Sequence, residues 1–183
     1  MAKKSKAISK YEKDLAKLGS LPMTGTVLAI DPSSGSVGSQ PGFALFREGR
    51  LVEAGTIRVT PGDDIHARLF ELRRSLMEDF TTPDVLVTEN IPPFMGGGFN
   101  RAILNLHYSV GVILSVFLAK TIRVTPITWQ KNISKDSYCK SDTHDSIMMG
   151  LKVISDVQRK YGVDAEPEFS RLVALTHKEE LPW

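Results

Sequence analysis

TVLAIDP, residues 26–32, is a short apolar run that ends in an aspartate and a proline. Apolar runs of this length are typical of buried strands when turn-forming residues follow, as Ser33 to Gly35 do here. We therefore predict a buried strand over 26–30, with the carboxylate of Asp31 at its carboxyl end.

The rest of the chain alternates between strand and helix patterns. Two β-rich runs surround a hairpin turn, and helices and strands then alternate to the end. This order predicts a mixed sheet with helices on both faces, the α/β order of the RNase H-like fold, with five strands arranged 3-2-1-4-5. The expected elements after the first strand are strands at 42–47 and 51–59, a helix at 64–80, a strand at 84–88, a helix at 101–119, a strand at 122–124 and a helix at about 141–161.

A chain of 183 residues fits one compact domain with short appendages. We expect a basic helical extension over 1–22, the main domain over 23–163 and a C-terminal tail over 164–183. No apolar run reaches the roughly 18 uncharged residues of a membrane span, so no membrane association is expected. We expect no secretory signal, and the single cysteine, Cys139, excludes an intrachain disulfide. Both features favour a cytoplasmic protein, with an organelle as the alternative.

Basic residues cluster in two places although the net charge is only +2. The first cluster falls among apolar residues at helical spacing, which predicts a short amphipathic helix with a basic outer face. This face could bind nucleic acid or simply be solvated. The lysines are Lys3, Lys4, Lys6, Lys10, Lys13 and Lys17, and the apolar residues are Ile8, Tyr11, Leu15 and Leu18.

The second basic cluster comprises Lys131, Lys135 and Lys140, just before the most acidic short motif of the chain. Phosphate-binding cations beside carboxylates are what the cleavage of a polyanion requires. We therefore expect these lysines to bind DNA.

Two strand ends carry acids, Asp31 and Glu89, which are 58 positions apart in sequence. On the predicted topology these strands are parallel neighbours, so the two carboxylates come together at one sheet edge. A third acidic element, SDTHD at 141–145, begins the last helix, where Asp142 and Asp145 share a face. Alternatively, Asp142 is an N-cap and Asp145 an acid that the helix dipole favours.

Four convergent carboxylates imply a bound cation, since like charges repel when packed together. Magnesium or manganese fits the oxygen ligands, and no cysteine and histidine set with zinc spacing is present. Two such ions would support hydrolysis of a phosphodiester. His144 could donate a proton or contact phosphate, although histidines on exposed helix positions usually do neither.

Several of these motifs resemble those of RuvC-type Holliday junction resolvases. LAIDP at 28–32, VTE at 87–89 and DTHD at 142–145 resemble the three acidic motifs of that family, and Phe94-Met95 resembles its loop aromatic followed by methionine. VTP at 124–126 with Gln130-Lys131 resembles the segment before its basic loop. The resemblance spans roughly 26–153. It implies a homodimeric crossover junction endodeoxyribonuclease that makes paired, symmetric nicks in four-way DNA with magnesium or manganese.

Departures from the family pattern suggest a diverged branch, of phage or organellar type. Pro92 and Pro93 lengthen the stretch after Glu89, and three glycines at 96–98 follow. Phe94 and Phe99 could stack on DNA bases or fill core gaps, and Arg101 is a further DNA-binding candidate. The triple glycine lacks the Gly-Lys-Ser/Thr of a phosphate loop, so no nucleotide cofactor is expected.

The predicted helix at 101–119 is apolar nearly all round, although a helix that covers one sheet face needs only one apolar stripe. We expect Leu106, Tyr108 and Val110 to form a dimer interface, with Gly111 allowing close approach. The terminal helices could cover this surface instead.

Three other functions stay open. A nuclease of the same fold could act on flaps, single strands or RNA, and a non-catalytic protein could bind junctions without cutting them. A fragment of the actin-like ATPase fold is disfavoured, because such proteins need two domains and this chain is too short.

Overall fold

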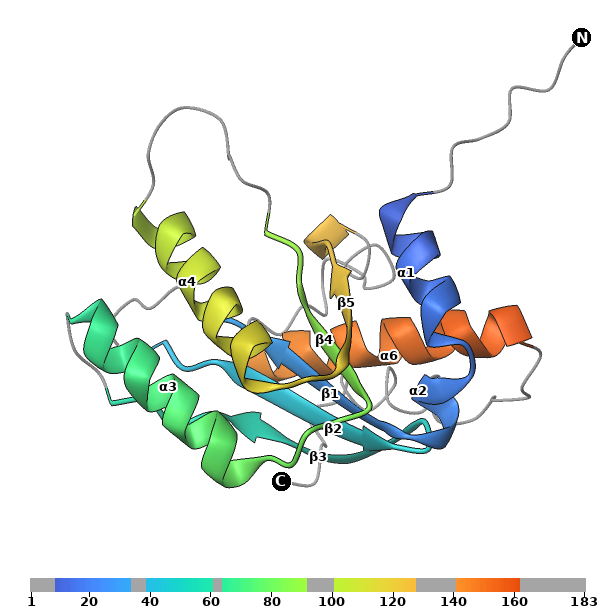
Figure 1. Cartoon of the computed structure of the whole chain (residues 1–183), viewed down its shortest axis with the longest axis horizontal. Helices are drawn as coiled ribbons and strands as arrows, with labels where there is room; N and C mark the ends of the chain where they lie inside the picture. Colours follow the sequence, from blue (N-terminus) through green and yellow to red (C-terminus); the bar gives the residue numbers. More distant parts are fainter. Residues whose placement is uncertain (1–8, 34–38, 61–63, 92–100, 128–140, 162–183) are drawn as a thin grey trace, which may run out of the picture.

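A five-stranded mixed sheet forms the centre of the structure, a computed structural model that describes residues 9–33, 39–60, 64–91, 101–127 and 141–161 (Figure 1). The strand order is β3-β2-β1-β4-β5, which confirms the predicted order. The sheet is antiparallel from β1 through β2 to β3 and parallel from β1 through β4 to β5. The elements are α1 (Lys10–Leu18), α2 (Leu21–Thr24), β1 (Thr26–Asp31), β2 (Gly42–Arg47), β3 (Arg50–Thr56), α3 (Ile65–Asp79), β4 (Val85–Glu89), α4 (Arg101–Val116), β5 (Lys120–Val124) and α6 (Asp142–Tyr161).

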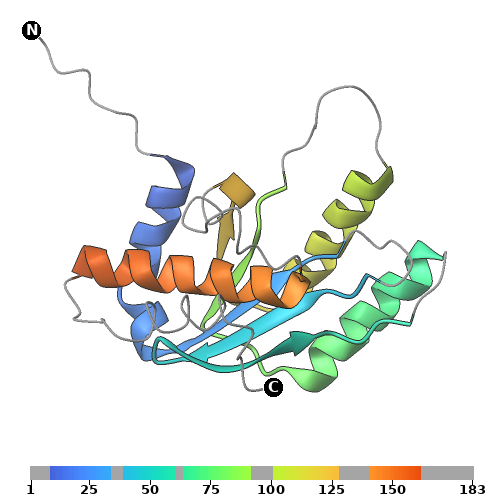
Figure 2. The same cartoon turned by 180° about the vertical axis from the view of Figure 1, so that it is seen from behind.

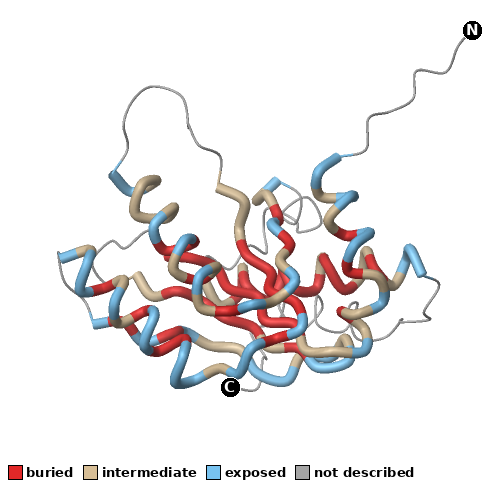
Figure 3. Tube along the Cα trace, viewed as in Figure 1, coloured by how far each residue is buried: buried red, intermediate tan, exposed pale blue. Residues whose placement is uncertain are grey.

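Helices cover both faces of the sheet, as the sequence predicts (Figures 1 and 2). Alternate residues of β1 point to opposite sides. Val27 and Ala29 belong to the core under α6 and α1, whereas Leu28 and Ile30 belong to the core under α3 and α4. Both cores are buried along the strands (Figure 3), so β1 is covered on both sides and reads as a continuous apolar run. Among the described residues, no helix is long and apolar enough to span a membrane.

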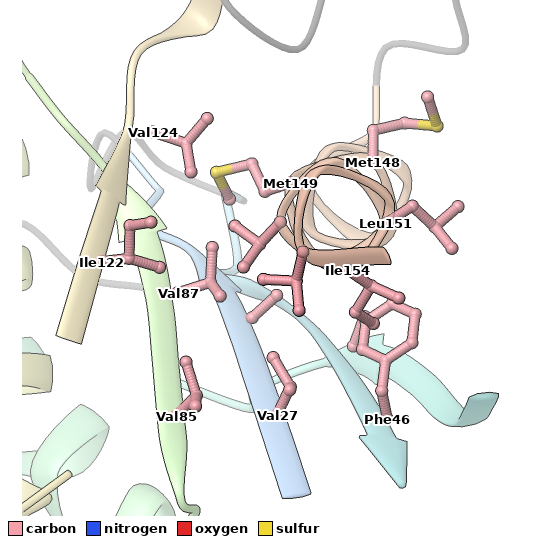
Figure 4. Close-up of a cluster of buried hydrophobic side chains, with 14 of the residues drawn as sticks. Val27, Phe46, Val85, Val87, Ile122, Val124, Met148, Met149, Leu151 and Ile154 are labelled. Carbon is pink, nitrogen blue, oxygen red and sulfur yellow. The ribbon is translucent and has the colours of Figure 1, made fainter. Parts of the chain in front are cut away.

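The long helix α6 lies directly against the sheet. It contributes Ile147, Met149 and Val153 to the first core. Figure 4 shows Met149 and Ile154 between the helix and the strands. A side chain at Gly150 would collide with the ring of Phe46 on β2, so glycine lets the helix approach the strand closely.

Helix α1 is part of the same core. Ser9 and Glu12 form a capping box that starts the helix, and Leu15 and Leu18 are buried in the cluster under α6. The helix contacts β5, the edge strand of the sheet. The basic helix of the sequence prediction therefore exists from Lys10 onward, while Lys3, Lys4, Lys6 and Ile8 lie outside the described residues.

Several predicted boundaries are wrong by a few residues. The third strand ends at Thr56 rather than at 59, although Ile57 and Val59 stay buried beyond it. The fourth helix ends at Val116 rather than at 119, and Leu118 is then almost fully exposed. The apolar run at 101–119 thus continues beyond the helix into the residues that link it to β5. Hydrophobicity alone does not distinguish helix residues from such linking residues.

The short helix α2 is not among the predicted elements, because a proline such as Pro22 usually interrupts a helix. Proline is tolerated in the first turn of a helix, where its missing N–H group has no partner to lose.

Candidate active site

Asp31 and Glu89 lie side by side at the carboxyl ends of two parallel strands. Ile30 of β1 pairs with Thr88 of β4, so the next residue of each strand is an acid and the two acids are neighbours. Asp31 is buried and Glu89 is half-buried. The predicted convergence of the two strand-end carboxylates is therefore correct.

The first turn of α6 brings the other two acids to the same place. Helix α6 begins at Asp142, and the hydroxyl of Ser141 accepts a hydrogen bond of 3.1 Å from the backbone N–H of His144. Ser141 thus occupies the capping role, which removes the alternative that Asp142 is the N-cap. Asp142 and Asp145 are both half-buried.

Hydrogen bonds between side chains of α6 and the backbone hold the start of this helix against β1 and β3. The hydroxyl of Ser146 accepts a hydrogen bond of 3.0 Å from the N–H of Asp31 and donates one of 2.8 Å to the carbonyl of Asp142. The hydroxyl of Thr143 donates a 3.0 Å hydrogen bond to the carbonyl of Gly55. The strand partner of Asp31 is Gly42, and a Cβ atom there would overlap the backbone of Asp142.

The four acids influence one another strongly. Burial contributes most to raising the pKa of Asp31, and the negative charges of Glu89, Asp145 and Asp142 add to the shift in that order, which together bring this pKa to about 9. Burial also raises the pKa of Glu89 to about 7, with contributions from Asp145 and Asp142. The pKa of Asp142 is raised by burial and by Asp145, and a hydrogen bond from Ser39 opposes this shift. The surroundings of the site therefore do not stabilise the ionised forms of all these carboxyl groups at once.

This charge excess fits a divalent cation. All four side chains offer the oxygen ligands that magnesium and manganese prefer, and a cation would favour their ionised forms. Within the described part of the chain, no three acidic, histidine or cysteine side chains stand close enough together to enclose an ion. An ion that binds here therefore has to draw the carboxylates toward itself.

The prediction that His144 is exposed is wrong. Its side chain is 5% exposed, and Nδ1 lies 3.8 Å from Oδ1 of Asp145. The amphipathic period of α6 turns this position toward the core. His144 is therefore placed beside the carboxylate of Asp145.

Most of the predicted DNA-binding residues lie outside the described residues, namely Lys131, Lys135, Lys140, Phe94 and Phe99. Arg101 is described, and it is exposed at the first position of α4.

Sequence analysis missed the residues that position the acids. Ser146 and Gly42 are ordinary residue types in a helix and at a strand start, and nothing in their local sequence marks them. Ser146 lies four residues after Asp142, and that helical spacing was the available signal.

The strand order and the helices on both faces of the sheet are those of the RNase H-like fold, and solved structures with the same arrangement include RuvC. No protein-family model matches the chain, and no curated protein matches it in sequence. Among solved structures, T. thermophilus RuvC in complex with a Holliday junction substrate is similar with a TM-score of 0.56 at 13% identity. A second structure of Thermus thermophilus RuvC is similar with a TM-score of 0.51 at 12% identity. Each similarity covers 75% of this chain and 96% of the RuvC chain, so this chain has the RuvC-like form of the fold.

Proposed function

We propose that this protein is a metal-dependent endonuclease that resolves four-way DNA junctions by paired, symmetric nicks. The observation that carries the proposal is the meeting of Asp31 and Glu89 with the first turn of α6, where burial and then the neighbouring carboxylates raise the pKa of Asp31. The RuvC-like fold supports the choice of substrate, because one of the similar structures is a complex with a Holliday junction.

Asp31, Glu89, Asp142 and Asp145 would hold two magnesium or manganese ions. Such ions activate a water molecule and stabilise the leaving 3′-oxygen of a phosphodiester. The protein contributes rigidity: Asp31 and Glu89 stand on paired strands, and Ser146 ties the backbone of Asp31 to that of Asp142. Their burial also limits the access of bulk water to the charges.

A nuclease of the same fold that acts on flaps, single strands or RNA would use the same four acids. A protein that only binds junctions would not need them, and a fragment of the actin-like ATPase fold would need a second domain. The substrate therefore has to be settled by cleavage rather than by the geometry of the acids.

The deciding experiment is cleavage of an end-labelled four-way junction beside matched duplex, flap, single-stranded and RNA controls, with and without magnesium or manganese. Paired nicks restricted to the junction would establish a resolvase. Equal cutting of flaps or single strands would retain the active site and reject junction specificity. Binding without any metal-dependent cutting would leave a junction-binding protein.

We also propose that the protein is a homodimer that uses the outer face of α4. Tyr108 is 46% exposed there and Leu106 is half-buried, whereas Val110 is buried in the core and is removed from the predicted interface. Sedimentation velocity at micromolar concentration should give a dimer, and Tyr108→Arg should shift it toward monomer. A wild-type monomer would reject this interface.

A further inference from the structure

A groove of about 980 Å³ lies between α1, the end of β5 and the C-terminal half of α6. Figure 1 shows α1 beside β5 and close to the later turns of α6. Asn90 and Thr125, the residues that follow Glu89 and Val124, also line it. The N–H of Asn90 donates a 2.9 Å hydrogen bond to the carbonyl of Val124, so the groove continues directly from the strand end that carries Glu89.

The wall that α1 provides is fixed in place. The hydroxyl of Tyr11 donates a 2.9 Å hydrogen bond to Asp156 of α6, and burial followed by the charge of Asp156 raises the pKa of Tyr11. Lys152 donates to both oxygens of Asp156, at 2.7 and 2.8 Å. Leu15 and Leu18 bury the inner face of the same helix. The basic side chains of α1 are therefore held at a set position relative to the acids.

The groove is basic, with six basic and three acidic side chains among its lining residues. The acids are already engaged: Glu12 with Ser9, Asp14 with lysines of its own helix, and Asp156 as described above. By contrast, Lys13 of α1 and Arg123 of β5 are both exposed, and neither forms an ion pair with any residue that the structure describes. The six basic residues are Lys10, Lys13, Arg123, Lys152, Arg159 and Lys160.

We propose that this groove binds the phosphodiester backbone of the nucleic-acid strand that leaves the active site, with Lys13 and Arg123 as phosphate contacts. A polyanion bound over Glu89 meets the groove at Asn90 and finds two cations there, which come from separate elements. Phosphate contacts fix the position of a nucleic acid without reading its sequence. This inference rests on the proposed function, since it extends the substrate path of the same site.

The test uses Asp31→Asn protein, so that bound DNA stays uncut, with and without the pair Lys13→Ala and Arg123→Ala. Binding of a fluorescent four-way junction is measured by anisotropy over a salt series. Loss of two phosphate contacts should weaken binding and reduce the slope of log K against log salt by about two. The matched control is Arg73→Ala with Arg74→Ala, two exposed arginines of α3, which packs on the other face of the sheet.

Hydroxyl-radical footprinting gives a second readout. The groove variant should lose protection on one side of the scissile phosphate and keep it elsewhere, whereas the control should keep the whole footprint. A salt slope and footprint equal to those of the control would overturn the proposal.

The two proposals fail in different ways. If metal-dependent cutting by the active protein is intact but the groove variant keeps the salt slope of the control, only the groove is rejected. If the slope falls by about two but the active protein cuts no nucleic acid with metal, the groove stands and the nuclease is rejected. If the Asp31→Asn protein binds no nucleic acid, the groove is rejected, and the nuclease is rejected with it when the active protein also cuts none.

Discussion

The backbone N–H of Asp31 donates a hydrogen bond of 3.0 Å to the hydroxyl of Ser146, 115 positions later in the chain. The same hydroxyl donates to the carbonyl of Asp142, so one buried side chain joins the strand and the helix that carry the acids. The hydroxyl of Ser146 therefore positions the acids through the backbone groups of Asp31 and Asp142. Substitutions of the carboxyl groups themselves would leave these hydrogen bonds in place.

Ser146→Ala should destabilise the fold by about 1–3 kcal/mol, because it leaves a buried N–H without an acceptor. It should also raise the manganese concentration needed for half-maximal cleavage, since Asp31 and Asp142 lose their fixed relation. Ser155→Ala is the matched control, because Ser155 makes a comparable bond to the carbonyl of Lys152 further along the same helix. Equal metal dependence in both variants would show that Ser146 is only structural.

Asp31→Asn, Glu89→Gln and Asp145→Asn should each abolish cleavage while folding and junction binding persist. Loss of a metal ligand should exceed the roughly 10- to 100-fold loss that follows removal of a ligand's hydrogen-bond partner. Single-turnover cleavage and anisotropy measure the two properties separately. Asp79→Asn, at the exposed end of α3, should cut normally. Activity retained in any two of the three variants contradicts the site assignment.

Thermal unfolding in the presence of a metal chelator should reveal how burial affects the ionisation of Asp31. The pKa of Asp31 is about 9 in the folded protein, compared with its ordinary value of 3.8 in an unfolded chain, so the folded state binds the proton more tightly. The contribution of Asp31 to the free energy of unfolding is therefore fully present below its unfolded-state pKa of 3.8 and is lost as the pH rises toward its folded-state pKa of about 9. The melting temperature of the wild type should therefore fall more steeply than that of Asp31→Asn between about pH 5 and pH 9.

Added manganese should reverse this loss in the wild type, because binding to the folded state stabilises it. Asp31→Asn should gain less. Parallel pH profiles for the two proteins, or equal gains with manganese, would show that Asp31 does not carry a buried, cation-responsive charge.

Gly42→Ala should displace the start of α6, because the new Cβ would overlap the backbone of Asp142 and Thr143 rather than a flexible side chain. We expect a melting temperature well below that of the wild type, together with loss of cleavage. Leu118→Ala is the control for thermal stability, since this side chain is almost fully exposed after the end of α4. A Gly42→Ala protein as stable and active as the wild type would contradict the close packing at this point.

The sequence by itself determined the sheet and two of the acids. Apolar runs that end in Asp31 and Glu89 specify buried strands with terminal carboxylates, and the hairpin followed by helix-linked strands specifies the order in which they pair. These features are local, because strand and helix periods are properties of neighbouring residues.

The tertiary structure alone decided how the acids are held and what surrounds them. Ser146, Gly42 and the burial of His144 depend on contacts between distant segments, and no local pattern encodes such contacts. The groove has the same origin: Lys13 and Arg123 are far apart in sequence and line one surface only because α1 packs on the edge strand. Periodicity fixes which face of an element is buried, whereas the packing of elements fixes which exposed residues meet.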